Sequence, residues 1–368
     1  MAVENKTTKK GSGILGGLLL LVIGVGILWS NEGRTVKTQS AISEAKKSFV
    51  NVKSDKVNSK NEGKLVATKG KITLDEDNML KDDIFGISKN AVKLKRKVEM
   101  YQWNEECETD ENDNEKCTYK KVWDEDLIDS SEFSESGHNN PSEMLYETEE
   151  YISEDVHLGA FILPEELIKS LKYDKKVGVD QIKEQYNNSK ENVKVSDRYL
   201  STVKEDTPEI GDIRISYEYT TPKAVSVMAV QTDNTFEAFT SKKGKDIYTI
   251  VEGNKTGIQI LENMASSNKA MKWFLRFLGV FLVISGFTSM FSLLSNLTSK
   301  VPVLGSIVGG ATSLVSTILG IATSLIVISI AWFRFRPVLS IILIVIVVAL
   351  ILFLKFFKPE TKEVKDTK

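Results

Sequence analysis

Charge is missing from four long stretches of this sequence. Charged residues make up 27% of its 368 residues, yet these stretches contain no Asp, Glu, Lys or Arg. They are Gly11–Asn31, Phe277–Ser299, Val301–Phe333 and Pro337–Leu354. About 20 apolar residues are enough to cross a hydrocarbon core roughly 30 Å thick. The absence of charge therefore excludes an ordinary soluble protein and predicts a membrane protein with about four transmembrane α-helices.

Cysteine and histidine are also scarce, with two of each. A structural zinc site needs four Cys or His ligands at close spacing, which Cys107 and Cys117 with two distant histidines do not provide. The chain also lacks a Gly-x-Ser-x-Gly elbow, a His-Glu-x-x-His pair, a Walker loop and a dinucleotide-binding fingerprint. We therefore predict a non-enzymatic protein with no catalytic residue, metal, cofactor or nucleic-acid partner.

The charge-free stretches set the predicted order of segments. These are a cytoplasmic tail (1–12), transmembrane helix 1 (13–30), a lumenal or periplasmic α+β domain (31–272), transmembrane helix 2 (273–298), an interfacial segment with transmembrane helix 3 (301–333), transmembrane helix 4 (337–354) and a basic cytoplasmic tail (355–368). The third stretch is either one tilted span or an interfacial helix followed by a span. A cleaved signal peptide is the alternative for the first stretch, but Gly13–Trp29 is longer than the ~7–15 apolar residues of such a peptide.

Lysines beside the first and last stretches predict the orientation. They are Lys6, Lys9, Lys10, Lys355, Lys358, Lys362, Lys365 and Lys368. Because Lys and Arg near span ends favour the cytoplasmic side, both termini are predicted to be cytoplasmic and the large domain lies across the membrane. Arg334 and Arg336 disagree, since four spans put their loop outside. A re-entrant third stretch would place that loop inside and the carboxyl end outside.

Roughly 240 residues between the first two spans are enough for a folded domain, which we predict to be mixed α+β and rich in strands. Predicted strands are Lys64–Leu74, Ala91–Gln102, Thr118–Ile128, Ile210–Tyr219, Ala224–Gln231 and Asp246–Val251. Predicted helices are Val36–Val50, a helical region past Pro141 with Pro164 in a first turn, and Gly257–Lys272. In Ala91–Gln102 apolar and charged residues alternate, and Arg96 interrupts the apolar face.

Cys107 and Cys117 flank an acidic turn between two predicted strands. The ends of a hairpin loop bring Cβ atoms to disulfide distance, and an exported domain lies in an oxidising space, so we predict a Cys107–Cys117 bond. Two unrelated thiols or a weak metal site are the alternatives. The turn from Glu105 to Glu115 has no glycine of the kind that a calcium loop needs, which favours a solvated loop.

Three further residues have conditional roles. His138, in a turn between Gly137 and Pro141, is the candidate base of an alternative function, a membrane-bound hydrolase. No Ser, Cys or carboxylate pair stands in a recognisable frame with it. Asn187 and Asn254 each begin an Asn-x-Ser/Thr triplet, which accepts a glycan only in a eukaryotic host.

Small residues recur every four positions in the third stretch, at Thr312, Ser316, Gly320 and Ser324. Such a face lets helices approach closely, so it predicts either packing among the four helices or self-association into a homo-oligomer. The spans contain no ionisable residue of the kind that lines ion pathways, and a small channel is therefore only a third alternative.

Six segments together resemble the transmembrane protein 43 family, also called LUMA. In order along the chain they are Trp29–Arg34, Asn61–Val66, Ala91–Trp103, Gly137–His138 with Asn140–Ser142, Gly211–Tyr217 and Arg336–Pro337. Each segment is unspecific by itself, and their order carries the resemblance. The cysteine pair and the acidic hairpin tip depart from the family's pattern.

The resemblance implies a multi-span protein of the endoplasmic reticulum and inner nuclear membrane, with its large domain in the lumen and perinuclear space. It also implies self-association, partners such as lamins and emerin, and no established enzymatic activity. Family members occur in bacteria as well, where the chain would lie in the cytoplasmic membrane and the nuclear partners would not apply. We therefore predict a membrane scaffold that organises membrane-associated protein complexes.

Overall fold

The computed structural model describes residues 9–75, 77, 79–109, 115–186, 192–196, 199–204, 207–298, 305–333 and 337–356. The chain forms two compact units. The helical unit lies within 1–47, 240–246 and 261–368, and the β-rich unit within 48–239 and 247–260. The segment 31–272, predicted as one extramembrane domain, therefore contributes residues to both units.

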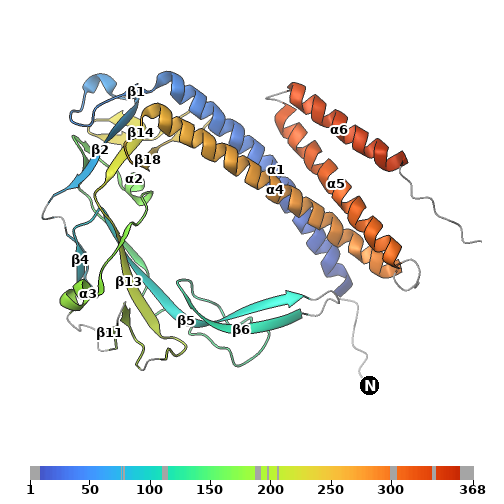
Figure 1. Cartoon of the computed structure of the whole chain (residues 1–368), viewed down its shortest axis with the longest axis horizontal. Coiled ribbons are helices and arrows are strands. Elements are labelled where there is room, and N and C mark those ends of the chain that lie inside the picture. The colour runs from blue at the N-terminus through green and yellow to red at the C-terminus, as the bar shows by residue number, and fades with distance from the viewer. Residues whose placement is uncertain are drawn as a thin grey trace, which may run out of the picture. The chain divides into compact units, whose positions relative to one another are not determined.

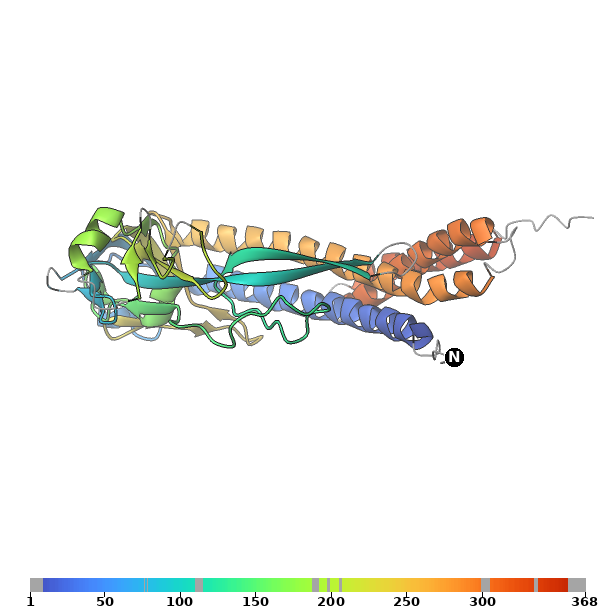
Figure 2. The ribbon, with the colours of Figure 1, turned by 90° about the horizontal axis from the view of Figure 1, so that it is seen from below.

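Long helices dominate the helical unit (Figure 1). Among the described residues they are α1 (Lys9–Ser48), α4 (Gly257–Thr298), α5 (Gly305–Phe333) and α6 (Pro337–Phe356). In both ribbon views α1 and α4 run side by side (Figures 1 and 2). Helices α5 and α6 pack against each other.

Three helical segments of the described chain are long and apolar enough to cross a membrane. They are Leu15–Ser48, Gly257–Phe291 and Ser313–Phe333. Ile344–Phe353, within α6, is a shorter apolar helix, so a fourth span stays a prediction. The sequence predicted a span followed by a separate amphipathic helix, but α1 is one continuous helix. The residues that join the two parts contain no proline that would end the helix.

Glycines let α1 and α4 approach closely. A Cβ on Gly17 would lie 2.8 Å from the carbonyl oxygen of Gly286, and one on Gly24 would lie 2.9 Å from that of Gly279. Small residues allow such backbone contact between membrane helices. In each helix the two glycines are seven positions apart, which is two helical turns, so both contacts fall on the same helix face.

The first sheet of the β-rich unit has the order β15-β14-β2-β8-β9, with β1 on β2 and β18 on β14. Its strands are β1 (Val50–Asn51), β2 (Leu65–Leu74), β8 (Val156–Leu158), β9 (Phe161–Ile162), β14 (Ala224–Thr232), β15 (Thr235–Glu237) and β18 (Thr249–Glu252). Buried Val66, Ile72 and Val227 pack in one core with Leu167 and Ile168 of helix α2 (Glu165–Lys169).

The second sheet has the order β11-β12-β13-β5-β6, with β10 on β13 and β7 on β5. Its strands are β5 (Lys93–Thr109), β6 (Glu115–Asp124), β7 (Glu149–Ile152), β10 (Lys175–Lys176), β11 (Lys194–Val195), β12 (Leu200–Ser201) and β13 (Ile213–Thr220). The predicted alternation in β5 is present, because Leu94, Val98 and Met100 are buried in a second core with Ile213 and Ile215 of β13.

Smaller elements complete the unit. They are a 3-10 helix (Ser59–Asn61), helix α3 (Val179–Gln185), the ladder of β3 (Leu80–Asp82) with β4 (Ile87–Lys89), and the ladder of β16 (Phe239–Thr240) with β17 (Asp246–Ile247).

Two sequence predictions in this unit are wrong. The region past Pro141 forms strands β7, β8 and β9 before the five-residue α2, because β7 pairs with β5 and β8 pairs with β2, both distant in sequence, and β9 pairs with β8. Strand β6 ends at Asp124 instead of Ile128. Beyond it the side chain of Gln102 replaces the ladder, donating to Asp126 O at 2.8 Å and accepting from the Ile128 N–H at 2.8 Å.

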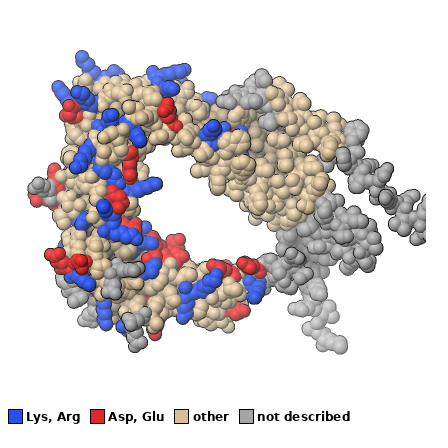
Figure 3. Space-filling model, viewed as in Figure 1, with Lys and Arg blue, Asp and Glu red and all other residues tan. Residues whose placement is uncertain are grey.

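Charge is distributed unevenly between the units (Figure 3). Lys, Arg, Asp and Glu are spread over the β-rich unit, whereas the visible surface of the apolar parts of α4 and α5 is free of them. This distribution is the one that a lipid-embedded helical unit and a solvated β-rich unit require.

Candidate functional site

The second sheet contains a buried ionic cluster. Strand register places Arg96 opposite Tyr217 of β13 and Glu149 of β7. The Nη1 atom of Arg96 donates to Asp82 Oδ1 at 2.8 Å and to the Tyr151 hydroxyl at 2.9 Å, and Nη2 donates to Glu149 Oε2 at 2.8 Å. The Tyr217 hydroxyl donates to Asp82 Oδ2 at 2.7 Å. Each carboxylate oxygen of Asp82 thus accepts a hydrogen bond.

The cluster holds fixed protonation states. Burial raises the pKa of the Tyr217 hydroxyl well above its ordinary value, and the carboxylate of Asp82 acts in the same direction. The pKa of Arg96 is also raised, because its bonds to Asp82 outweigh its desolvation. A charged arginine and a protonated tyrosine at neutral pH are typical of a structural ion pair, because the raised pKa values keep the protons on Arg96 and Tyr217.

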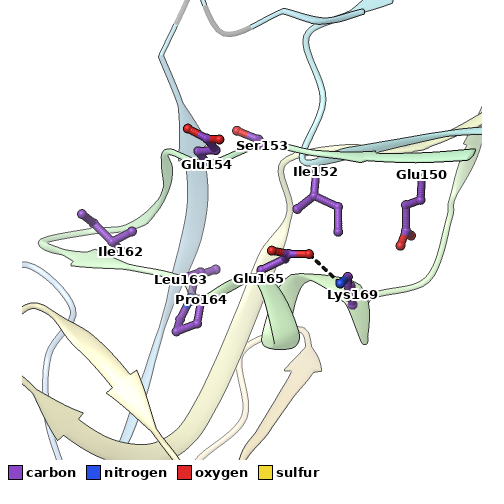
Figure 4. A pocket seen from close by; sticks show the side chains of 9 residues that line it. All are labelled: Glu150, Ile152, Ser153, Glu154, Ile162, Leu163, Pro164, Glu165 and Lys169. Carbon is purple, nitrogen blue, oxygen red and sulfur yellow. Dashed lines mark ion pairs between the residues drawn. The ribbon is translucent and has the colours of Figure 1, made fainter. Parts of the chain in front are cut away.

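An open cleft of about 590 Å³ lies on the same unit (Figure 4). Its polar wall is formed by Glu150, Glu154, Glu165 and Lys169, and Glu165 pairs with Lys169 at 2.5 Å. Carboxylates dominate this wall, but an acid or base in catalysis needs a pKa shifted towards neutrality.

Glu150 does not meet that requirement. Burial would raise the pKa of its carboxyl, but hydrogen bonds from the Tyr173 hydroxyl and from Lys93 Nζ outweigh it and hold the pKa below its ordinary value. Lys93 is 3% exposed and also lies 4.2 Å from the centroid of the Tyr173 ring. Two of the carboxylates on this cleft, Glu150 and Glu165, are therefore held in ion pairs with Lys93 and Lys169.

The β5–β6 hairpin carries the two cysteines. Cys107 lies directly opposite Cys117 in the ladder, and a disulfide joins them. Glu105 lies within reach of both sulfur atoms, but disulfide sulfurs are poor metal ligands because metals bind the thiolate. The pKa of Glu105 is lowered chiefly by the hydrogen bond from the Tyr119 hydroxyl, and the Ser134 N–H adds to this effect.

His138 packs among the aromatic rings of the same hairpin. Its ring stacks on that of Tyr119, with 3.8 Å between the ring centroids. It also makes an edge-to-face contact with Trp103, with 4.6 Å between the centroids. Within the described residues it makes no hydrogen bond to a serine or a carboxylate, and its Nδ1 is buried without a partner. The arrangement anchors the loop after β6 and lacks the nucleophile–base contact that a hydrolase needs.

A second group of polar side chains lies between α1 and α4 in the helical unit. We call Asn31, Glu32, Arg34, Asn268 and Arg276 the polar collar. Arg276 Nε donates to Glu32 Oε1 at 2.5 Å, and Glu32 is 1% exposed. Arg34 donates to Asn268 Oδ1 at 3.0 Å and to Asn31 Oδ1 at 3.1 Å. These bonds join the two helices next to their apolar spans.

The polar collar is not saturated. Glu32 Oε2 and Arg34 Nε are buried without a hydrogen-bond partner, as is the hydroxyl of Thr35 one turn further along α1. Buried polar atoms without a partner cost about 1–3 kcal/mol each, so they are rare in purely structural positions. Unsaturated polar atoms beside membrane spans make this region the stronger candidate for function.

Comparison with known sequences identifies the relationship. The sequence profile of the family described as Transmembrane protein 43 matches residues 100–337, which is more than half of the chain. The chain belongs to the transmembrane protein 43 family. Transmembrane protein 43 of Homo sapiens is 25% identical over 357 residues, covering 92% of this chain and 88% of the human one.

Other members of the transmembrane protein 43 family align over a similar length. The protein of Mus musculus is 25% identical over 351 residues, covering 90% of this chain and 86% of its own. The homolog of Drosophila melanogaster is 26% identical over 351 residues, covering 88% and 89%. No solved structure matches the chain. Transmembrane protein 43 is not known as an enzyme family.

The predicted helix-packing face of this chain is buried against another helix of the same chain. Ser316 and Ser324 are buried on α5, and a Cβ on Gly320 would lie 2.5 Å from Ile284 of α4. Thr312 lies on α5, with its side chain outside the described part of the structure. Of the two alternatives for this face, the structure therefore contains packing within the chain.

The glycan candidates differ in position. Asn187 lies outside the described residues, whereas Asn254 is exposed two residues before the Thr256 cap of α4. The polar collar itself was missed by motif reasoning, although Asn31, Glu32 and Arg34 belong to a segment that carries the family resemblance. Two charged residues, Glu32 and Arg34, directly after an apolar run were the available signal.

Proposed function

We propose that this protein is a non-enzymatic membrane scaffold whose β-rich unit binds protein partners through the β5–β6 hairpin. The single observation that carries the proposal is the construction of that hairpin. Strand β6 pairs with β5 on one side and is the last strand of its sheet in the described topology. An edge strand of this kind offers backbone donors and acceptors to a partner segment.

The disulfide supports this role. Cys107–Cys117 ties the two strands together close to the hairpin tip, so the edge is presented in a fixed register. Side chains of both signs are exposed on it, including the pair of Lys120 with Glu106 at 2.7 Å. Charged side chains on an edge restrict which segments can pair with it, which favours chosen partners over general aggregation.

The anchor of the scaffold is the helical unit. We propose that α6 forms a fourth span, that both termini are cytoplasmic and that the β-rich unit lies in the endoplasmic reticulum lumen or perinuclear space of a nucleated host. We propose lamin- and emerin-like partners only for such a host, and self-association into a homo-oligomer for either kind of host. In a bacterial host the same arrangement belongs to the cytoplasmic membrane.

Site-specific photo-crosslinking in intact membranes tests the proposal. A crosslinking residue in place of Lys116 on β6 is expected to capture a discrete protein, and one in place of exposed Lys60, on the 3-10 helix of the same unit, is not. Adducts of twice the chain mass would identify a homo-oligomer. Equal capture at both positions, or none at Lys116, would contradict partner binding by the hairpin.

A protease-protection experiment tests the topology separately. A protease site inserted beside Lys116 should be cut in sealed vesicles only after detergent is added. Cleavage from the cytosolic face would contradict the lumenal location of the β-rich unit. It would leave the proposal that the hairpin binds partners unaffected.

A further inference from the structure

The helical unit has a cavity at the level where its candidate spans end. Its volume is about 360 Å³, and its wall includes Thr35, Gln39 and Ser43 of α1, Lys243 of the 240–246 segment, Lys272 of α4 and Trp332 of α5. All of these residues belong to the same compact unit. An adjoining cavity of about 380 Å³ shares Thr35, Gln39 and Lys272.

Tryptophans mark the membrane level of this cavity. Trp29 follows the apolar part of α1, Trp273 precedes that of α4, and Trp332 lies at the end of α5. The guanidinium of Arg276 lies 5.1 Å from the Trp273 ring centroid and 5.3 Å from that of Trp332. Tryptophans gather at the boundary between hydrocarbon and headgroups, so one boundary passes through all three helices here.

Most of the cavity wall lies on the polar side of that boundary. Thr35 is six residues beyond Trp29 on the continuous helix α1, a rise of ~9 Å. The headgroup layer is about 5–8 Å thick on each side of the hydrocarbon core. The wall includes Trp332 at the boundary and Thr35 ~9 Å from it, and therefore spans the layer in which the phosphates of a phospholipid leaflet lie.

Charge around the cavity is strongly positive. The parts of the helical unit beyond the boundary, residues 29–47, 240–246 and 261–276, contain ten Lys or Arg and four Asp or Glu. Of the acidic residues, Glu32 is paired with Arg276 and Glu44 accepts the N–H of Lys242. A basic pocket between membrane helices is the arrangement that binds anionic headgroups.

One side chain on the wall has an unmet polar group. Thr35 is 8% exposed and its hydroxyl makes no hydrogen bond, although threonine hydroxyls in helices commonly donate to a carbonyl one turn back. A phosphate oxygen in the cavity would accept this donor. The two lysines, the hydroxyls and the Trp332 ring together match a phosphate on a lipid more closely than they match an acidic peptide, because Trp332 on the wall lies at the bilayer boundary.

We propose that this cavity binds the headgroup phosphate of an anionic phospholipid, with Lys243 and Lys272 on either side of it. The acyl chains of that lipid lie along the apolar surfaces of α4 and α5, where Phe281 and Ile330 are 65% and 57% exposed. The site joins the 240–246 segment to the helices through a bound lipid, and it is independent of partner binding by the hairpin.

Native mass spectrometry of the purified full-length chain in detergent tests the proposal. Titration with phosphatidylglycerol is expected to give one saturable adduct that phosphatidylcholine does not give. In K243A/K272A the affinity should fall about 30-fold, since each lysine contributes roughly a factor of five. The matched control is K46A/K47A, which removes the same charge from exposed positions on α1 outside the cavity, and should bind as the parent does.

A second variant separates lipid binding from misfolding. Ser43→Trp adds a bulky side chain on the exposed wall of the cavity while keeping both lysines, and it should also lose the adduct at an unchanged unfolding temperature. Equal loss in K46A/K47A would reduce the effect to general charge attraction and overturn the site. Inorganic phosphate that displaces the lipid at equal concentration would show a soluble ligand instead of a lipid, and would overturn the proposal as well.

Discussion

The two units each bury a carboxylate–guanidinium pair, but they complete it differently. In the β-rich unit Asp82 and Arg96 are surrounded by matching donors and acceptors, with Tyr217 and Tyr151 supplying bonds from neighbouring strands. In the helical unit Glu32 and Arg276 share one short bond, and Glu32 Oε2 has no partner. A buried ion pair whose polar atoms all have hydrogen-bond partners is typical of a structural role. Buried polar atoms without partners at a membrane boundary are typical of a region that contacts lipid or solvent.

The largest expected effect comes from removing the arginine of the saturated pair. Arg96→Met leaves the buried carboxylate of Asp82 without its counter-charge, which should lower the free energy of unfolding by about 3–5 kcal/mol. The control is Lys120→Met on the same sheet, where both Lys120 and its partner Glu106 are exposed. Its effect on the free energy of unfolding should be far smaller. Denaturant unfolding of the full chain in detergent measures both, and equal losses would contradict the distinction.

Neutralising each carboxylate compares the pairs directly. Asp82→Asn puts a donor towards Arg96 or Tyr217 and should cost about 2–3 kcal/mol, because hydrogen bonds to charged groups are lost. Glu32→Gln keeps an acceptor for Arg276 at Oε1, and the position of Oε2 has no partner to lose. Its cost should stay below about 1 kcal/mol. If both variants lose the same free energy of unfolding, the number of hydrogen bonds made by each carboxylate does not determine its contribution to stability.

Close helix packing gives a third comparison. Gly279→Leu places a side chain against the backbone of α1 and should destabilise the helical unit by about 1–3 kcal/mol. Gly26→Leu is the matched control, because a Cβ there has no neighbour within 4 Å. Thermal unfolding in detergent should separate the two variants. The same melting temperature for both would show that the glycine contacts do not hold α1 to α4.

The smallest expected effect concerns acid. The pKa of Glu150 is lowered in the folded chain, so its contribution to stability is present above its ordinary value of 4.5 and is lost as the pH falls through the lowered folded pKa. Glu150→Gln should therefore flatten the fall in unfolding temperature on acidification from about pH 6 to pH 3. Glu165→Gln, in the exposed pair with Lys169, should leave that slope unchanged.

Hydrophobic pattern predicted the elements that bury one continuous face. The apolar runs within α1, α4 and α5 and the alternation in β5 were visible because burial repeats with the period of the element. The strands β7 to β9 were mistaken for helix, since short strands with exposed residues are set by pairing with β2 and β5. Helix α3 was not predicted for a similar reason, as it buries only Ile182.

The candidate site was predicted less well than the fold. Cys107 and Cys117 could be placed together from their positions around a turn, a local feature. Arg96 was noticed only as an interruption, because its side-chain partners Asp82, Glu149 and Tyr151 come from two other strands, β3 and β7. The cavity at Thr35 was not predicted at all, since Lys243, Lys272 and Trp332 are far apart in the sequence.

Membrane character was determined by the sequence alone. A span needs about 20 residues without charge, and such a run is a local property of the sequence that does not depend on tertiary contacts. The arrangement of buried charge was decided only by the tertiary structure. Arg96 and Glu32 each depend on residues at least 14 positions away for their counter-charge, and the energy of a buried ion depends on the geometry of all its neighbours.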